Sequence, residues 1–392
     1  MTFETVRLGD ICITNQLSYS PKDKWNHVNY LDTGNITQNC IDEIQSIDLT
    51  TEKLPSRAKR KVKHNSIIFS TVRPNQLHYG IIKEQPENFL VSTGFTVIDV
   101  YPNKADADFV YYSLTQTEII QHLQAIAEQS TSAYPSIKAS DIEDLEIVLP
   151  DIETQRRISA IFQALDKKKV INAAINENLH QLIAAYYAEI FKECEHTAKI
   201  SDYADKVFSG GTPTTSNESY WSGEFKWLSS GETSQKYIVD TEKTITQAGV
   251  DNSSTRLAKK YDTVIASAGQ GHTRGQTSML LTDTYINQSI IVVESERIYM
   301  PFIYWNICGR YEELRIISNS NSVRGSLTTK MISAFTAPKA DITQISRFSE
   351  LAWAAIHEIE KNCNEIARLA ALRDTLLPKL MNGEIDVSAV EI

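Results

Sequence analysis

The residues best suited to specific chemistry are polar side chains that follow two predicted strands, one in each half of the chain. The first set follows a β-branched and aromatic run at 66–70 and comprises Thr71, Arg73, Asn75, Gln76 and His78. The second set follows a similar run at 263–266 and comprises Gln270, His272, Thr273 and Arg274. Arg pairs with guanine, and Asn or Gln pairs with adenine, in the major groove of DNA. Both sets are therefore suited to read base edges of a duplex.

Basic residues precede each of these sets. In the stretch 53–63, six of eleven residues are Lys or Arg, and the candidates for phosphate contact are Lys59, Arg60, Lys61 and Lys63. The corresponding candidates in the second half are Arg256, Lys259 and Lys260. Phosphate contacts position a protein on DNA without reading its sequence. A solvated loop is an equally simple interpretation of one Lys-rich stretch, so the prediction depends on finding the same pairing in both halves.

Two loops rich in Ser or Asn each precede a short predicted helix. The first spans 129–135 and contains Tyr134, and the second spans 318–325 and contains Arg324. Both are consistent with ordinary turns. As functional loops, they would bring Tyr134 and Arg324 to the sugar and phosphate groups of DNA.

No catalytic signature is visible. The chain has no Pro-Pro pair, which excludes the Pro-Pro-aromatic loop of nucleic-acid amino-methyltransferases. The glycine-rich stretch 269–275 lacks the spacing and the Lys of a phosphate-binding loop. No His pair has metal-ligand spacing, and the five cysteines never form a C-x-x-C pair. We therefore expect a protein that is not an enzyme, with no cofactor and no metal.

Composition limits the class of protein. The net charge of −10 argues against strong DNA binding by the isolated chain, so the basic stretch predicts weak binding alone and tighter binding within an assembly. The N-terminus lacks the features of a signal peptide, and no run of about 18 apolar residues is present. The scattered cysteines are typical of reduced thiols. These features predict a cytoplasmic protein with no membrane contact.

The chain repeats itself at about half its length. The opening pattern at 6–12 recurs at 198–204, and the proline-marked entry into a helix at 147–152 recurs at 335–342. Each half ends in a pattern typical of a helix of about 40 residues, which would be roughly 60 Å long. A chain with two similar halves has an approximate twofold relation, and this suits it to a two-sided target such as duplex DNA.

The pattern predicts four segments: a globular domain at 1–150, a central long helix at 151–195, a second globular domain at 196–340, and a C-terminal long helix with a tail at 341–392. Single helices are also expected at 108–128 and 301–316. The last long helix follows a heptad with Ile356, Cys363, Ala370 and Leu377 at a and Ile359, Ile366, Arg373 and Leu380 at d. We expect an α/β (α+β) fold, pseudo-twofold symmetric, with the two domains separated by two antiparallel coiled-coil helices.

Three motifs resemble those of the specificity subunits of type I restriction–modification systems. The sequence GGTPT at 210–214, followed by YWSGEFKWLSSGE at 220–232, resembles the opening of a target recognition domain of that family. The helix entry LPDIETQRRI at 149–158 and the C-terminal LLPKLMNGEI at 376–385 resemble two further motifs. The second helix entry, at 341–348, lacks the double basic pair, and the first domain does not open with Gly-Gly-Thr-Pro.

This resemblance implies a subunit without chemistry of its own. It implies that each target recognition domain reads one half of a bipartite DNA sequence, and that the long helices set the gap between the halves. The implied partners are double-stranded DNA, two copies of an adenine-methyltransferase subunit that uses S-adenosylmethionine, and an ATP-driven restriction subunit for host defence. Two alternatives remain at this stage: the specificity subunit of a methylation-only system, and a coiled-coil adaptor that binds no DNA.

Overall fold

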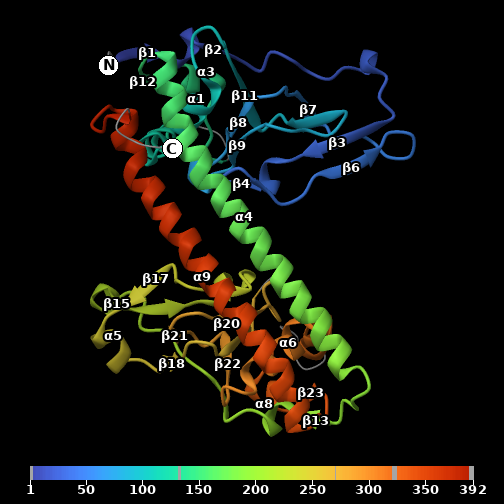
Figure 1. Cartoon of the computed structure of the whole chain (residues 1–392). Coiled ribbons are helices and arrows are strands. Elements are labelled where there is room, and N and C mark those ends of the chain that lie inside the picture. The colour runs from blue at the N-terminus through green and yellow to red at the C-terminus, as the bar shows by residue number, and fades with distance from the viewer. Residues whose placement is uncertain (1–2, 131–133, 270, 320–324, 388–392) are drawn as a thin grey trace. The chain divides into compact units, whose positions relative to one another are not determined.

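The structure is a computed structural model that describes residues 3–130, 134–269, 271–319 and 325–387. The chain forms two compact units. Unit 1 contains Met1–Lys167 and Leu369–Ile392, and unit 2 contains Lys168–Arg368. Both units share two 40-residue helices, α4 (Ile152–Phe191) and α9 (Ile342–Met381), drawn in green and red in Figure 1. In the described part of the chain, no helix has an apolar stretch long enough to span a membrane.

Within its described residues, unit 1 contains two four-stranded sheets, two small strand pairs and three short α-helices. The first sheet has the order β6 (Gln45–Asp48), β3 (His27–Leu31), β10 (Phe89–Ser92) and β7 (Ala58–Lys61). The second has the order β2 (Cys12–Thr14), β11 (Phe95–Val100), β8 (Ile67–Ser70) and β9 (Tyr79–Ile81). The pairs are β1 (Glu4–Arg7) with β12 (Glu146–Leu149) and β4 (Ile36–Thr37) with β5 (Cys40–Ile41). The helices are α1 (Ala107–Leu114), α2 (Thr117–Glu128) and α3 (Ala139–Glu143).

Unit 2 follows the same plan. One sheet has the order β17 (Lys243–Ile245), β15 (Trp221–Leu228), β21 (Thr284–Ile286) and β18 (Arg256–Ala258). The other has the order β14 (Lys206–Ser209), β22 (Ile290–Glu294), β19 (Thr263–Ala266), β20 (Thr277–Leu280) and β16 (Tyr237–Ile238). Strand β13 (Ala198–Lys199) pairs with β23 (Thr336–Ala337). The helices are α5 (Gln247–Asp251), α6 (Met300–Cys308), α7 (Tyr311–Asn319) and α8 (Thr329–Ser333).

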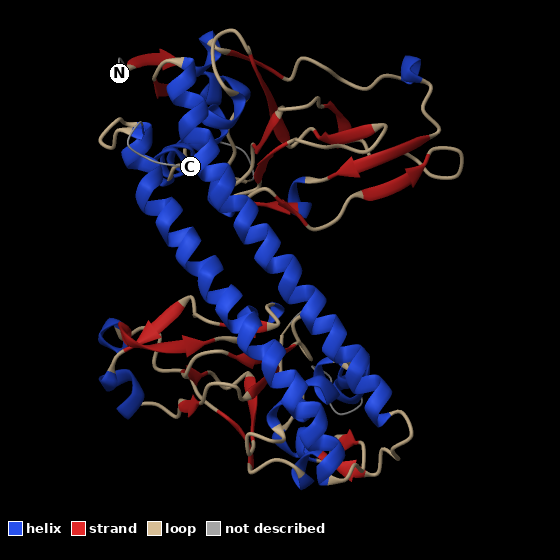
Figure 2. Cartoon of the chain, in the orientation of Figure 1, coloured by secondary structure: helices blue, strands red, loops and turns tan. Residues whose placement is uncertain are grey.

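The repeat predicted from the sequence is visible in eight strands that take the same order in both units, while β16 joins the second sheet of unit 2 only. In each unit the first sheet contains one parallel pair, β3 with β10 in unit 1 and β15 with β21 in unit 2. The opening pattern folds in both units into a short 3-10 helix, at Leu8–Asp10 and at Ile200–Asp202. Figure 2 shows the mixture of helices and strands in both units. The α/β (α+β) class with two sheet-rich domains is therefore confirmed.

The long helices contribute to the core of both units. The start of α4 supplies Phe162 to the core of unit 1, where the end of α9 supplies Leu380. In unit 2 the end of α4 supplies Ile183 and the start of α9 supplies Phe348. Burying each of these side chains stabilises its unit by about 1.5–3 kcal/mol. Within each unit the two helices therefore pack together in antiparallel directions, as the sequence predicted.

Two predicted helices are each divided in two. The expected helix 108–128 stops at Leu114 because Thr115 and Gln116 donate side-chain hydrogen bonds to the carbonyls of Tyr112 and Ser113, which a continuing helix would use. The expected helix 301–316 is interrupted after α6, which ends at Cys308 and is followed by Gly309.

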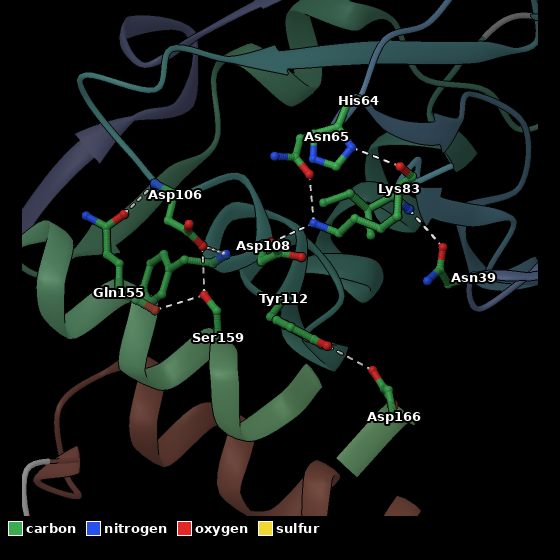
Figure 3. A network of polar contacts seen from close by, with 12 residues as sticks. Asn39, His64, Asn65, Lys83, Asp106, Asp108, Tyr112, Gln155, Ser159 and Asp166 are labelled. Carbon is green, nitrogen blue, oxygen red and sulfur yellow. Dashed lines mark hydrogen bonds and ion pairs between the residues drawn. The ribbon is translucent and has the colours of Figure 1, made fainter. Parts of the chain in front are cut away.

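A polar network joins α4 to its domain in unit 1 (Figure 3). Gln155 is 1% exposed. Its Oε1 accepts a hydrogen bond of 2.8 Å from the Asp106 backbone N, and its Nε2 donates to the carbonyl of Pro150 at 2.7 Å. Ser159 Oγ donates to Asp106 Oδ1 at 2.8 Å. The glutamine of the helix-entry motif therefore fixes the helix to the domain.

Unit 2 joins α9 to its domain through the equivalent serine. Ser349 lies 190 residues after Ser159, and its Oγ donates to the carbonyl of Ile298 at 2.6 Å. One turn later, Trp353 Nε1 donates to the carbonyl of Arg297 at 3.1 Å. Satisfied polar contacts of this kind hold an element in one position. Each long helix is thus held by the domain at its start.

Candidate nucleic-acid interface

In unit 1 the loop after β8 meets the loop before α3. The backbone N of Ile137 donates to the carbonyl of Thr71 at 2.8 Å, and the backbone N of Arg73 donates to the carbonyl of Pro135 at 3.0 Å. The Arg73 guanidinium lies 5.4 Å from the ring centroid of Tyr134, within reach of a cation–π interaction. The structure therefore brings Arg73 and Tyr134, two separately predicted residues, into one surface.

The same two loops meet in unit 2. The backbone N of Leu327 donates to the carbonyl of Ser267 at 2.9 Å, which repeats the contact of Ile137 with Thr71. Arg274 Nη1 donates to the carbonyl of Gly325 at 2.8 Å. The predicted residues Gln270 and Arg324 lie outside the described residues. The common contact means that the two loop pairs occupy equivalent places in the repeat.

The backbone of the unit 1 loop is strained. Arg73 and Leu77 have φ values of 47° and 60°, which lie in the left-handed region that favours glycine. They flank a short 3-10 helix, Pro74–Gln76. Left-handed backbone in residues other than Gly costs of order 1–3 kcal/mol and clusters at functional sites. The strain makes the Arg73–Leu77 turn a candidate binding loop.

Side chains of this loop divide into exposed and internally bonded groups. Arg73, Asn75 and Gln76 are exposed. Thr71 Oγ1 donates to the carbonyl of Gly94 at 2.9 Å, and His78 Nδ1 lies 2.6 Å from the Ile36 carbonyl oxygen. The exposed residues have the amide and guanidinium groups that base recognition requires. Thr71 and His78 instead stabilise the loop through bonds within the unit.

Arg274 lies inside unit 2. It is 8% exposed, and its guanidinium also donates to Asn319 Oδ1. A Cβ on Gly325 would lie 2.3 Å from Arg274 Nη1, so this packing requires glycine there. A base-reading role would require Arg274 to leave these bonds.

The neighbouring residues of the unit 2 loop lie nearer to solvent. His272 is exposed and Thr273 is half-buried. Their backbone is held by α7, because Tyr311 Oη donates to the His272 carbonyl at 2.8 Å and Arg315 Nη1 donates to the Gly271 carbonyl at 2.8 Å. The loop therefore presents the His272 side chain from a fixed backbone.

The basic stretch of unit 1 contains strand β7, whose outer edge is bonded to Leu17 and Tyr19: the Tyr19 backbone N donates to the Lys59 carbonyl at 2.7 Å, and the Lys61 backbone N donates to the Leu17 carbonyl at 3.1 Å. Lys59, Arg60 and Lys61 lie on β7, at one end of the sheet order. Lys61 forms an ion pair with Asp23 and lies 5.0 Å from the ring centroid of Trp25. Burial lowers the pKa of the Arg60 guanidinium. Lys59 is exposed. Through its contacts with Asp23 and Trp25, Lys61 has a structural role beside the proposed functional one.

The structure reveals one ion pair that is repeated in both units. Lys63 Nζ lies 3.4 Å from Asp99 Oδ2, and Lys259 Nζ lies 2.9 Å from Glu294 Oε1. Both acids lie on equivalent strands, β11 and β22. Lys260 likewise pairs with Glu360 of α9. Phosphate contact by these lysines would have to replace an internal partner.

Arg256 is the exposed basic residue of β18 in unit 2. It lies 196 residues after Arg60, on the strand equivalent to β7. Its guanidinium carbon lies 4.0 Å from the ring centroid of Phe208. Arginine stacked on an aromatic ring retains donors at its edge, so Arg256 combines a fixed position with access to solvent.

A pocket near the opening segment of unit 2 adds candidates that the sequence analysis missed. Trp221 Nε1 donates to the carbonyl of Thr214 at 3.3 Å, and Lys243 Nζ lies 5.7 Å from the ring centroid of Trp221. The adjacent pocket has a volume of about 460 Å³ and is also lined by Ser222, Thr244 and the acidic Glu242. An aromatic ring beside an ammonium suits nucleic acid. Only sheet pairing brings Lys243 to this place, so spacing along the sequence gave no signal.

Comparisons with known proteins agree on one family. The family model of the type I restriction modification DNA specificity domain matches residues 1–181. The specificity subunit of the type I restriction enzyme HindI from Haemophilus influenzae is 22% identical over 462 residues, covering 96% of this chain and 98% of that protein. The specificity subunit of EcoR124I/EcoR124II from Escherichia coli is 26% identical over 202 residues, covering 49% and 50% of the two chains.

A solved structure shows the same fold. The S subunit of a type I restriction–modification system from M. genitalium matches with a TM-score of 0.58 and 15% identity, over 97% of this chain and 96% of that chain. At this identity the likeness concerns the fold alone.

Proposed function

Because this chain belongs to the family of specificity subunits of type I restriction–modification systems, we propose that it reads a bipartite DNA target with one unit for each half-site. The observation that carries the proposal is the repeated loop pair. In unit 1 the loop after β8 is joined to the loop before α3 by the Ile137–Thr71 bond. In unit 2 the loop after β19 is joined to the loop before α8 by the Leu327–Ser267 bond.

Base reading is assigned first to the side chains of these loops that are exposed or half-buried. Arg73, Asn75 and Gln76 carry the donors and acceptors in unit 1, and His272 and Thr273 carry them in unit 2. Arg274 supports the second loop from inside. Hydrogen bonds to base edges give sequence preference because each base pair presents a distinct pattern in the major groove.

Phosphate contact is assigned first to Lys59 and Arg256, which are exposed and lie on equivalent strands. Lys61, Lys63, Lys259 and Lys260 have acidic partners. On DNA these lysines would exchange a carboxylate for a phosphate, so their net contribution would be smaller. Tyr134 and the loop residue Arg324 are proposed to touch the sugar–phosphate backbone.

Methyl transfer and cleavage are assigned to partner subunits. Two grooves occupy similar places in the repeat and could receive two copies of an adenine methyltransferase. The groove of unit 1 is lined by the α1–α2 junction, β12 and the last turn of α9, including Gln116, Val148 and Met381. The groove of unit 2 is lined by the α6–α7 junction and α4, including Arg310 and Ala188. A restriction subunit would join this assembly.

Reconstitution tests this proposal. The purified chain should neither methylate nor cleave DNA, and the methyltransferase subunit alone should show no sequence preference. Mixing the two should give methylation at one bipartite sequence. Methyl transfer by the pure chain would refute the proposal. So would the same sequence preference from the methyltransferase subunit in the absence of the chain.

A further inference from the structure

A layer of asparagines lies buried in the helix pair of unit 2. Asn172 of α4 and Asn362 of α9 are 0% and 4% exposed, and Asn176, one turn after Asn172, is 8% exposed. Asn172 and Asn362 are each the twenty-first residue of a 40-residue helix. The layer therefore lies at the midpoint of both helices, at positions related by the repeat.

The hydrogen bonds of this layer cross from one helix to the other. Asn362 Nδ2 donates to Asn176 Oδ1 at 2.9 Å, and Asn176 Nδ2 donates to Cys363 Sγ at 3.3 Å. Asn172 Nδ2 donates to Glu365 Oε2 at 2.7 Å. Lys168 Nζ lies 3.5 Å from the same Glu365 oxygen. The amides are thus matched in one alignment of the helices.

This arrangement is not the most stable choice for a helix pair. Asn172 Oδ1 is buried, with no hydrogen-bond partner within the described residues. An unsatisfied buried polar atom costs about 1–3 kcal/mol, and well-packed apolar residues at such sites are often neutral or stabilising. Farther along the pair, Ile183 and Ile359 are almost fully buried. The asparagines place polar groups in a contact between the two helices that is otherwise apolar.

Buried amides in helix pairs select one register. Apolar side chains pack against many different apolar neighbours. A contact made only of Leu and Ile therefore does not by itself select one register of the two helices. A displacement by one heptad, roughly 10 Å, would place the amides against apolar groups. Asn362 and Asn176 would then lose their mutual bond. The alternative registers would be disfavoured by unpaired amides.

We propose that Asn172, Asn176 and Asn362 are positioning residues that fix the register of α4 against α9 and thereby the spacer length that the subunit accepts. The proposal rests on the proposed function, in which the helices hold two reading domains at a defined separation. Each helix is held by the domain at its start through Ser159 or Ser349, and its far end packs in the core of the other unit, so the asparagine layer acts together with these cores in aligning the helices. Sliding of the pair would therefore change the distance between the reading loops.

The test compares the double variant Asn176→Leu/Asn362→Leu with the native chain, each assembled with the methyltransferase subunit. Methylation is measured on DNAs with the native half-sites and spacers about one to three base pairs shorter or longer, since a slip of one heptad corresponds to about three base pairs. The variant should fold with equal or higher thermal stability. Its preference for the native spacer should fall at least about tenfold. A matched control, Ile183→Leu/Ile359→Leu, should retain the native preference.

A second measurement reports the register without DNA. Spin labels on cysteines placed at Gln181 and Glu358, both exposed in unit 2, should give one distance in the native helix pair and a second population in the double variant. If the double variant does not fold, Asn362→Leu alone serves the same comparison, and Asn362→Gln should restore the native behaviour.

The two measurements separate the inference from the proposed function. One distance and an unchanged spacer preference in the folded double variant would overturn the register role. A second distance with an unchanged spacer preference would leave the register assignment intact and contradict the spacer-setting function. Relaxed spacing together with a second distance is the result we expect.

Discussion

Gln76 and Lys59 test the two kinds of DNA contact at the scale of single residues. Gln76→Ala should weaken binding to the target by about 1–3 kcal/mol and relax the preference at one position of the first half-site, because base contacts carry sequence information. Lys59→Ala should weaken binding to all sequences alike and reduce the slope of log affinity against log salt by about 1. Both are measured by titration with target and random DNA on the assembled methyltransferase.

Lys61→Ala is the matched control for Lys59→Ala, because Lys61 lies on the same strand and pairs with Asp23. We expect it to change the salt slope less. An equal loss for target and random DNA in Gln76→Ala would remove its base-reading role. An unchanged salt slope in Lys59→Ala would remove its phosphate-contact role.

Asp262 gives a prediction about pH. Burial raises its pKa to about 7, and Glu294 nearby acts in the same direction. Because this pKa lies above that of the unfolded chain, stability is highest when the carboxyl is protonated and falls as pH rises from about 4 to about 7. The equivalent residue of unit 1 is Ser66, whose Oγ accepts a bond of 2.9 Å from the Lys63 backbone N. Asp262 accepts the same bond from Lys259.

Asp262→Ser should therefore stabilise the protein at pH 8, by on the order of 4 kcal/mol at most, and have little effect near pH 4. Thermal unfolding between these pH values measures the difference. The exposed Glu218→Ser is the control and should show no such pH-dependent gain. A gain that is the same at both pH values would disprove the role of the buried carboxyl.

Single residues also mark the limit of prediction from sequence. The polar loops were recognised because Arg, Asn and Gln follow a strand, and Arg73 and Gln76 are indeed exposed there. The burial of Arg274 depends on Gly325, more than 50 residues away, and the pairing of Lys63 depends on Asp99 of another strand. Neither contact has a periodicity or a local motif that sequence reasoning could use.

At the scale of elements, the long helices were the most predictable part of the fold. A sustained helical period over about 40 residues allows few alternatives, and α4 and α9 begin and end close to the predicted residues. The short strands β3 and β6 were not predicted, because their sheet order depends on long-range pairing. The asparagine layer also escaped notice, since the heptad placed Cys363 at the seam where Asn362 is more deeply buried.

The helices give a prediction about spacing. Each unit contains packed segments of both helices. A four-residue insertion in α4 between Lys167 and Lys168, with another in α9 between Arg368 and Leu369, should therefore leave both units intact. It adds about 6 Å to each helix, which corresponds to about two base pairs. The accepted spacer should lengthen by that amount, with both half-sites unchanged.

Methylation of a library with randomised spacers measures this change. The same insertion in α4 alone is the control, and it should reduce stability because the two helices would no longer match in length. A stable paired-insertion variant that keeps the native spacer would show that the helices do not measure the gap.

At the scale of the whole molecule, the repeat is the feature that links fold to function. Eight strands take the same order in both units, with β16 added in unit 2, and both units have the same loop contact and the same serine near the start of a long helix. The sequence repeat at about 190 residues predicted this duplication. The loops differ in sequence between the units, so each unit can recognise different bases from an equivalent place.

The central claim, one domain for each half-site, is tested most directly by exchanging residues 1–150 for the equivalent segment of a relative. Long-read methylation mapping in cells that express the chimera with the methyltransferase subunit would give its target sequence. The account predicts that one half-site changes to that of the donor while the other half-site stays as it was. A target in which both half-sites change, or neither does, would contradict it.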